Sequence, residues 1–177
     1  RVHPISHVKE DIMKEIFVRM ERCTGCKTCE LTCCIEHSQS KTLFGAFMET
    51  PMPRRRLFVE MDGDAKIPIA CRHCEDAPCL NACISGAISR DPKTNAVVSN
   101  PDKCIGCWSC IMACPYGVVN RSLERRVSVK CDLCPGRDSP ACVDSCPTNA
   151  LVYTEPEEFS RMKRQTYAAT AHQAVKT

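Results

Sequence analysis

The sequence predicts an α+β fold with two pseudo-duplicated domains, and three observations lead to it. Sixteen of the seventeen cysteines fall into four blocks of four, the spacing of the blocks alternates, and short β-prone runs flank them. Without its cysteines, the 44% hydrophobic fraction falls to roughly a third of the 177 residues. An apolar core this small needs additional stabilisation, which metal–thiolate bonds can supply. We expect the metal-free chain to be largely unfolded.

The cysteine blocks form an internal repeat. Blocks one and three read CxxCxxCxxxC, whereas blocks two and four have a wider second gap. In order, the blocks are Cys23, Cys26, Cys29 and Cys33; Cys71, Cys74, Cys79 and Cys83; Cys104, Cys107, Cys110 and Cys114; and Cys131, Cys134, Cys142 and Cys146. The chain therefore has an A-B-A′-B′ duplication.

The CxxCxxCxxxC spacing is that of bacterial ferredoxins. Two residues between successive thiolates let one loop wrap a cubane and offer it three sulfurs. The fourth cysteine points away, and in two-cluster ferredoxins it ligates the neighbouring cluster. Each pair of blocks therefore predicts a pair of clusters. The whole chain predicts two bacterial two-cluster ferredoxin-like domains with insertions, built around four [4Fe-4S] clusters.

Disulfides and structural zinc are the competing explanations of the cysteines. The odd cysteine count, the tight triplets and the lack of a signal stretch or twin-arginine leader in these residues disfavour an oxidised secreted scaffold. Zinc ribbons use two CxxC knuckles separated by a longer stretch. Blocks one and three instead give three cysteines at single-loop spacing, so both alternatives are less favoured than cubanes.

The expected elements follow the blocks. Strands are predicted at 16–20, 57–60, 96–98, 126–129 and 151–153, and short helices begin at 30–32 and 111–113, between the third and fourth cysteines of a block. Pro156 with the following glutamates fits a helix start. The segment 155–177 is either a tail that wraps a partner or one that is loosely held, and residues 1–15 form an extension before the first strand.

The longest insertion, 34–70, carries the Pro-rich basic stretch that ends in Arg54, Arg55 and Arg56. It is either a solvated loop or a segment for charge compensation or partner docking. The formal charge of +3 would fall to about −5 once sixteen thiolates held four cubane cores of about +2 each. The loaded protein is then acidic, which disfavours nucleic-acid binding.

Over residues 16–153 the chain resembles the four-cluster ferredoxin-type electron-transfer subunits that accompany molybdenum and tungsten oxidoreductases, formate dehydrogenases, hydrogenases and carbon monoxide dehydrogenase. The resemblance rests on CRHCEDAPC from Cys71 and CIGCWSCIMACPYGVV from Cys104. Within that group, CTGCKTCELTC with the following EHS and KTLF is most similar to the iron–sulfur subunit of carbon monoxide dehydrogenase. The subunit of tungsten aldehyde oxidoreductase is second.

The resemblance implies how the blocks combine. The outer blocks one and four share one pair of clusters, and the inner blocks two and three share the other. The implied ligands are Cys23, Cys26, Cys29 and Cys146 for cluster 1; Cys71, Cys74, Cys79 and Cys114 for cluster 2; Cys104, Cys107, Cys110 and Cys83 for cluster 3; and Cys131, Cys134, Cys142 and Cys33 for cluster 4. The outer domain is then 16–70 plus 119–154, and the inner domain is 71–118.

Several residues near the blocks need separate interpretation. Cys34 is left over, and the spacing favours Cys33 over it as the ligand. His73 is expected to form a hydrogen bond or lie at the surface rather than bind iron. Trp108 is expected to pack against a cluster loop rather than line an electron exit. The backbone N–H groups near Gly25 and Gly106 are expected to donate to sulfur.

The predicted function is a non-catalytic relay of single electrons through four [4Fe-4S] clusters. The expected partners are a catalytic oxidoreductase subunit and an NAD-linked flavoprotein or other electron acceptor, with possible self-association into a longer cluster chain. The alternative is an iron–sulfur redox-sensing or assembly module. No nucleotide-binding motif or nucleophile with a base indicates an enzyme, and no apolar stretch predicts a membrane span. A cytoplasmic location is expected because so many thiols must stay reduced.

Overall fold

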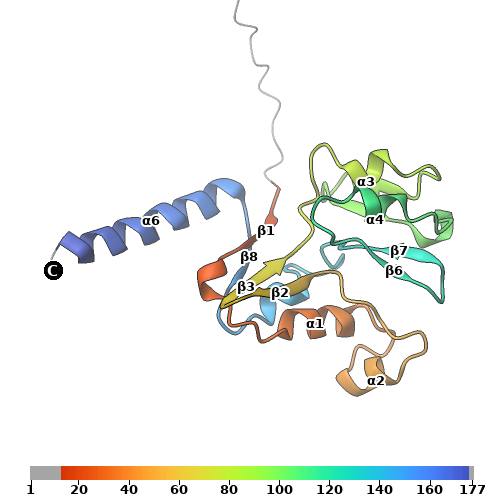
Figure 1. The fold of residues 1–177 in the computed structure, drawn as a ribbon, viewed down its shortest axis with the longest axis horizontal. Helices are drawn as coiled ribbons and strands as arrows, with labels where there is room; N and C mark the ends of the chain where they lie inside the picture. The colour runs from red at the N-terminus through yellow and green to blue at the C-terminus, as the bar shows by residue number, and fades with distance from the viewer. Residues whose placement is uncertain (1–12, 176–177) are drawn as a thin grey trace, which may run out of the picture.

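The computed structural model describes residues 13–175, so most of the predicted extension 1–15 lies outside the described residues. The chain runs through short elements connected by loops (Figure 1). These are β1 (Glu15–Val18), η1 (Met20–Arg22), α1 (Thr28–Glu36), α2 (Leu43–Met48), β2 (Phe58–Asp62), β3 (Ala65–Ile69), α3 (Pro78–Asn81), β4 (Ile88–Arg90), β5 (Val97–Ser99), η2 (Pro101–Lys103), α4 (Ser109–Ala113), β6 (Asn120–Ser122), β7 (Val127–Val129), α5 (Ala141–Asp144), β8 (Leu151–Thr154) and α6 (Pro156–Val175). The protein is a small mixed structure of helices and strands.

Within the described residues the strands form four antiparallel pairs, and three of them are local hairpins: β2–β3, β4–β5 and β6–β7. The fourth pair joins β1 to β8 from opposite ends of the sequence, with Ile16 opposite Tyr153 and Val18 opposite Leu151. Ile16 and Leu151 are buried beneath this sheet. The β1–β8 pairing thus brings block one beside block four.

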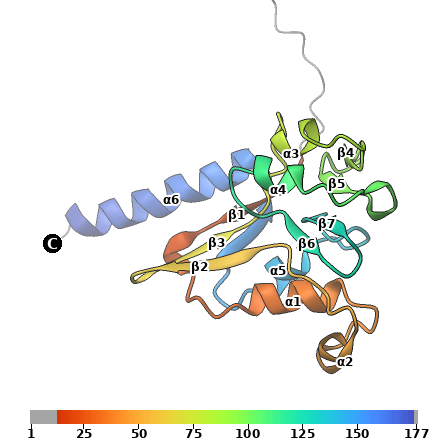
Figure 2. The ribbon, with the colours of Figure 1, turned by 45° about the vertical axis from the view of Figure 1, so that its right-hand side comes forward.

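Two hydrophobic cores lie under these sheets. The outer core consists of Ile16, Cys29, Cys33, Leu57, Val59, Ala70, Ala96, Leu133, Cys142 and Leu151. The inner core consists of Ala77, Cys79, Ile88, Val97, Cys110 and Val119. Helix α1 packs against α5 and α3 against α4, and in both views α3 and α4 lie together, away from α1 (Figures 1 and 2). Cysteines contribute to each core, as the thin apolar composition predicts.

Two hairpins cover the cysteine loops of blocks one and three. A Cβ added at Gly25 would lie 2.9 Å from side-chain atoms of Met61 and Lys66 in β2–β3. A Cβ added at Gly106 would lie 2.6 Å from the backbone oxygen of Arg126, in the β6–β7 turn. Both glycines also have positive φ, of 74° and 68°. Each loop therefore needs glycine both for its backbone conformation and for the close approach of its hairpin.

The basic stretch after Pro53 forms intramolecular ion pairs. Arg54 Nη2 lies 3.2 Å from Glu124 Oε1. Arg55 Nε lies 3.5 Å from Glu30 Oε2, and its guanidinium stacks over the Phe58 ring. The third arginine, Arg56, pairs with an aspartate of block four. The insertion is therefore exposed but joined by ion pairs to α1, to the turn between β6 and β7 and to block four, as charge compensation predicts.

Helix α6 contacts the body of the protein near its beginning. The Phe159 ring stacks on Phe17 with centroids 4.5 Å apart, and Lys163 Nζ lies 3.1 Å from Glu21 Oε1. Beyond Lys163 its residues are mostly exposed, and the helix extends away from the body (Figure 1). Its start at Pro156 confirms the predicted helix start. Between residues 13 and 175, no helix is both long and apolar enough to cross a membrane.

Candidate metal centres

The loops of blocks one and three have the same backbone course. A 3-10 turn leads to the first cysteine, and a glycine with positive φ precedes the second. Lys27 and Trp108, with φ of 58° and 65°, then cap α1 and α4. The two CxxCxxC loops therefore share one backbone conformation, and the spacing predicts that each offers three cysteines to one cluster. Trp108 also lies beneath the guanidinium of Arg121, 5.9 Å from its ring centroid.

Blocks two and four share a different loop. His73 and Leu133, at the same position of their CxxC pairs, have φ of 46° and 61°. Short helices α3 and α5 then begin at or directly after a proline, Pro78 and Pro140, and carry the third cysteine. The extra residues between the second and third cysteines of these blocks therefore lead to the first residue of a short helix.

We number the groups of cysteines after the clusters that they are expected to bind. The fourth group lines a buried cavity between the outer blocks. Its members are Cys33, Cys131, Cys134 and Cys142. Burial raises the pKa of the Cys33 thiol, and the charges of Cys131 and Cys134 act in the same direction. Burial likewise raises the pKa of Cys131 to about 12. Neutral thiols are favoured in so apolar a cavity unless bound iron stabilises the thiolates.

The second group lines a separate cavity in the inner half. Its members are Cys71, Cys74, Cys79 and Cys114. Burial raises the pKa of Cys79, Lys130 opposes that shift, and Cys71 and Cys114 add to it. The structure therefore brings together three cysteines of block two and the last cysteine of block three.

The first and third groups, which are the expected ligands of clusters 1 and 3, lie nearer the surface. Burial raises the pKa of Cys29 to about 11, and the charges of Cys146 and Cys26 add to the shift. Burial also raises the pKa of Cys110, with Cys104 and Cys83 adding to it. Cys26 and Cys107 are exposed. Hydrogen bonds from the hydroxyls of Thr28 and Ser109 lower the pKa of these two thiols.

Backbone N–H groups donate to cysteine sulfur at three of the groups. Arg56 N–H donates to Cys33 Sγ at 3.4 Å, Ser128 N–H to Cys104 Sγ at 3.3 Å and Ala150 N–H to Cys146 Sγ at 3.1 Å. Donors of this kind tune the potential of a bound cluster. They come from the segment before β2, from β7 and from the residues after block four, while in the glycine-containing loops the N–H groups of Thr28 and Ser109 donate to Cys26 and Cys107.

Cys34 lies apart from the four groups. Burial raises its pKa, and the charges that act on it belong to Arg55, Glu30 and Arg54 rather than to other cysteines. Cys33 lines the buried cavity of the fourth group, and Cys34 does not. One residue along α1 thus separates a thiol that faces the cavity from one that faces the arginine stretch.

A polar brace supports the fourth group. Asp132 accepts a hydrogen bond from His37 Nε2 at 3.1 Å and a short one from Arg56 Nη1. Burial alone would raise the pKa of Asp132, but the His37 hydrogen bond and the Arg56 charge hold it well below its usual range. His37 Nδ1 in turn lies 2.7 Å from the Cys33 carbonyl oxygen. Nothing in the sequence pattern indicates this brace, because its members are distant in the chain.

Two buried donors without a partner test whether these cavities fit a cluster. Among the described residues, the buried side-chain polar atoms that lack a hydrogen bond are Arg56 Nε and His73 Nε2. Arg56 lines the cavity of the fourth group, and His73 lines that of the second. Unpaired buried donors are costly, and cluster sulfur would accept from both. The two cavities therefore fit a [4Fe-4S] cluster.

His73 forms a hydrogen bond, as expected. Its Nδ1 accepts from Val97 N–H at 3.0 Å. Burial lowers its pKa to about 4, with the charge of Lys130 adding to the shift. The ring is therefore neutral at physiological pH.

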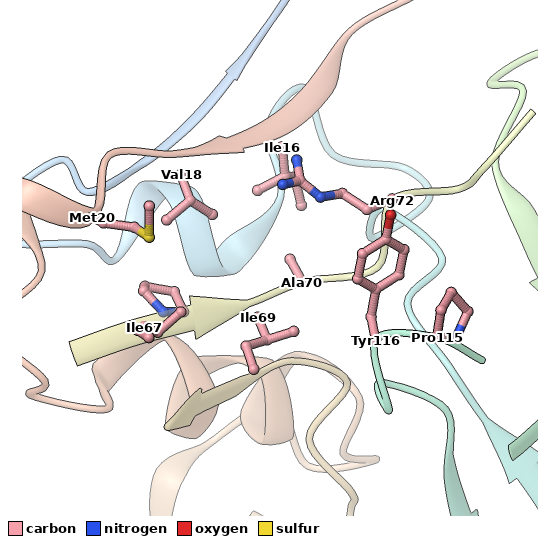
Figure 3. A pocket seen from close by; sticks show the side chains of 10 residues that line it. Ile16, Val18, Met20, Ile67, Ile69, Ala70, Arg72, Pro115 and Tyr116 are labelled. Carbon is pink, nitrogen blue, oxygen red and sulfur yellow. The ribbon is translucent and has the colours of Figure 1, made fainter. Parts of the chain in front are cut away.

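A surface groove of about 400 Å³ lies between β1, β3 and the turn after Cys114. Ile16 and Val18 of β1 lie opposite Ala70, which directly follows β3, and Arg72 and Tyr116 lie together at one end (Figure 3). Ile16 and Ala70 also wall the cavity of the fourth group, and Arg72 and Tyr116 wall that of the second. The groove is thus separated from both cavities by shared residues.

Comparison with known proteins gives consistent matches. Residues 65–155 match the 4Fe-4S dicluster domain family, and residues 20–45 match a 4Fe-4S binding domain. The electron transport protein HydN of Escherichia coli (strain K12) is 34% identical over 172 residues, covering 88% of this chain and 96% of the relative. An iron–sulfur protein of Rhodospirillum rubrum is 34% identical over 178 residues, covering 91% of each. The polyferredoxin-like subunit of aliphatic sulfonate oxidoreductase from Pyrococcus furiosus is 37% identical over 141 residues, covering 78% of this chain and 76% of the relative.

Proposed function

The chain belongs to the 4Fe-4S dicluster domain family of iron–sulfur electron transport proteins, and on that premise we propose a specific role. It relays single electrons through four [4Fe-4S] clusters, as a non-catalytic subunit. Its partners are a catalytic oxidoreductase subunit, of the carbon monoxide dehydrogenase, aldehyde oxidoreductase, formate dehydrogenase or hydrogenase type, and a second redox protein. The clusters supply the redox chemistry, and the chain supplies ligands, hydrogen bonds and burial.

The grouping of the thiols is the observation that carries the proposal. Each of the two groups that line a cavity joins three cysteines of one block to the last cysteine of another, and this supports cross-ligation of the kind found in two-cluster ferredoxins. The proposed ligands are Cys23, Cys26, Cys29 and Cys146 for cluster 1; Cys71, Cys74, Cys79 and Cys114 for cluster 2; Cys104, Cys107, Cys110 and Cys83 for cluster 3; and Cys131, Cys134, Cys142 and Cys33 for cluster 4. Cys34 ligates none of them. The outer blocks one and four then hold one pair of clusters, and the inner blocks two and three hold the other.

Contacts between the groups support a linear order of clusters 1, 4, 2 and 3. The charge of Cys29 acts on Cys142, which links groups 1 and 4. The charge of Cys71 acts on Cys131, which links groups 4 and 2. Groups 2 and 3 meet in the inner core through Cys79 and Cys110. In this order the exposed thiols Cys26 and Cys107 belong to the two end clusters, where partners would exchange electrons.

Metal analysis tests the ligand assignment. The anaerobically purified chain is expected to contain about sixteen iron and sixteen labile sulfide. Cys34→Ser is expected to keep that content, whereas Cys33→Ser loses cluster 4. Equal losses in the two variants would contradict the assignment of Cys33, and zinc without labile sulfide would contradict cluster binding altogether.

Electron delivery tests the relay itself. A low-potential dehydrogenase that co-purifies with the chain is expected to reduce all four clusters reversibly, and a second acceptor is expected to reoxidise them. The measurement is anaerobic stopped-flow absorbance of the cluster bands. Clusters that form fully but exchange no electrons with such a partner would favour the sensing or assembly role.

A further inference from the structure

A buried lysine lies between the two middle groups of cysteines. Lys130 is 3% exposed. It directly precedes Cys131 of group 4 and lines the cavity of group 2. Its Nζ donates a short hydrogen bond to the Val97 carbonyl oxygen and another, at 3.4 Å, to that of Cys131. Between residues 13 and 175 it has no carboxylate partner, and its charge acts on Cys79, Cys131 and His73.

An unpaired buried cation is costly unless nearby negative charge offsets it. An oxidised cubane with four thiolates carries about −2, and reduction adds one more negative charge. Lys130 therefore has clusters 2 and 4 as its natural counter-charges. Because a positive charge stabilises the more negative state, it favours reduction of both clusters.

The two unpartnered donors lie at the same middle groups. His73 Nδ1 accepts from Val97 N–H, so the proton of the neutral ring is on Nε2, which lacks an acceptor. Arg56 Nε is in the same situation at group 4. Hydrogen bonds to cluster sulfur also favour the reduced state. Both middle clusters thus have a buried donor in addition to the shared lysine.

The end groups lack this arrangement. The residues that directly precede blocks one and three, Arg22 and Lys103, are also basic but are exposed. The position of His73 is occupied by Gly25 and Gly106 in those blocks. Solvent screens an exposed charge far more than a buried one. The same residue type at the same position therefore acts strongly on the middle clusters and weakly on the ends.

We propose that Lys130, with the N–H donors of His73 and Arg56, raises the reduction potentials of clusters 4 and 2 above those of clusters 1 and 3. A single electron that enters at either end, from a reduced partner protein, then rests on the middle pair until an oxidised partner accepts it. This inference rests on the proposed relay and on its ligand assignment. It assigns the chain a storage role in addition to conduction.

The test is a potentiometric titration of the loaded full-length chain, followed by electron paramagnetic resonance. Lys130→Met removes the charge and keeps the side-chain length, and Lys103→Met is the matched control at an exposed basic residue before cluster 3. We expect Lys130→Met to lower two of the four midpoint potentials by at least about 59 mV, a tenfold change in the ratio of reduced to oxidised cluster. We expect Lys103→Met to leave all four within that limit.

His73→Leu provides a second test if Lys130→Met fails to retain its clusters. Leu133 adopts the same backbone conformation at the equivalent position, so leucine fits there. One midpoint potential is expected to fall in this variant. Full iron content with four unchanged potentials in His73→Leu, or in a loaded Lys130→Met, would overturn the inference. Too little iron and sulfide in the unaltered chain would instead indicate that the proposed function itself is wrong.

Discussion

The outer core and the inner core hold their cysteines by different means. The outer core depends on strands from opposite ends of the chain, β1 and β8, and on the arginine stretch that reaches Glu30 and Asp132. The inner core is closed by a local hairpin, β4–β5, within one short stretch of sequence. Thiols of the outer core, such as Cys33 and Cys142, also have strongly raised pKa values because they are deeply buried. Long-range contacts thus create a less hydrated cavity in the outer core. The stability of that cavity depends on individual polar contacts such as those of Asp132.

The largest expected effect comes from breaking the outer brace. Asp132→Ala leaves the Arg56 guanidinium partly buried without its carboxylate and removes the acceptor of His37. Loss of one partner of a buried pair costs about 3–5 kcal/mol. We expect cluster 4 to be lost first while the inner clusters remain. The measurement is anaerobic denaturant unfolding of the loaded protein, with iron content determined in parallel.

Asp144→Ala is the control for this variant in the same block. Asp144 forms an exposed ion pair with Arg137, at 2.8 Å, and such pairs contribute about 0–1 kcal/mol. If the two alanine variants lose the same free energy of unfolding, the brace contributes no more to the outer core than an exposed ion pair does.

The second prediction compares equivalent core residues of the two halves. Leu151 and Ile88 follow the same small-residue turn after blocks four and two, and both are buried. Truncation of either to alanine costs about 2–5 kcal/mol. Leu151→Ala is expected to release iron from clusters 1 and 4, and Ile88→Ala from clusters 2 and 3. Spectra of the remaining clusters identify which pair persists, and loss of all four in both variants would mean that the halves unfold together.

The third prediction compares the two loop glycines. Alanine at either position costs roughly 1–2 kcal/mol because φ is positive. At Gly25 the added Cβ meets side-chain atoms, the terminal Cε of Met61 and the Cγ of Lys66, which can shift by rotation of the side chains. At Gly106 it meets the backbone oxygen of Arg126, which cannot move without displacing the β6–β7 turn. Gly106→Ala is therefore expected to lower the melting temperature further than Gly25→Ala, and the reverse order would contradict this account of the hairpin contacts.

The sequence predicted the parts of the site that are encoded locally. The cysteine spacing indicated loops that hold cubanes, and the runs at 151–153 and 96–98 became β8 and β5. It did not predict that β1 pairs with β8, because nothing in a short strand specifies a partner at the other end of the chain. The roles of Lys130 and Asp132 could not be predicted for a similar reason. Their roles depend on burial between segments that meet only in the folded protein.

The smallest effect is expected where α6 joins the outer half. Phe159→Leu removes the stacking of its ring on Phe17, which is worth about 0.5–1.5 kcal/mol. Because α6 contacts the body through its first turns and not through a cysteine loop, iron content should stay unchanged. Hydrogen exchange should increase over 156–163, while Tyr167→Ala, at a residue that is 76% exposed, leaves that exchange unchanged. Loss of iron from Phe159→Leu would show instead that α6 helps the outer half to hold its clusters.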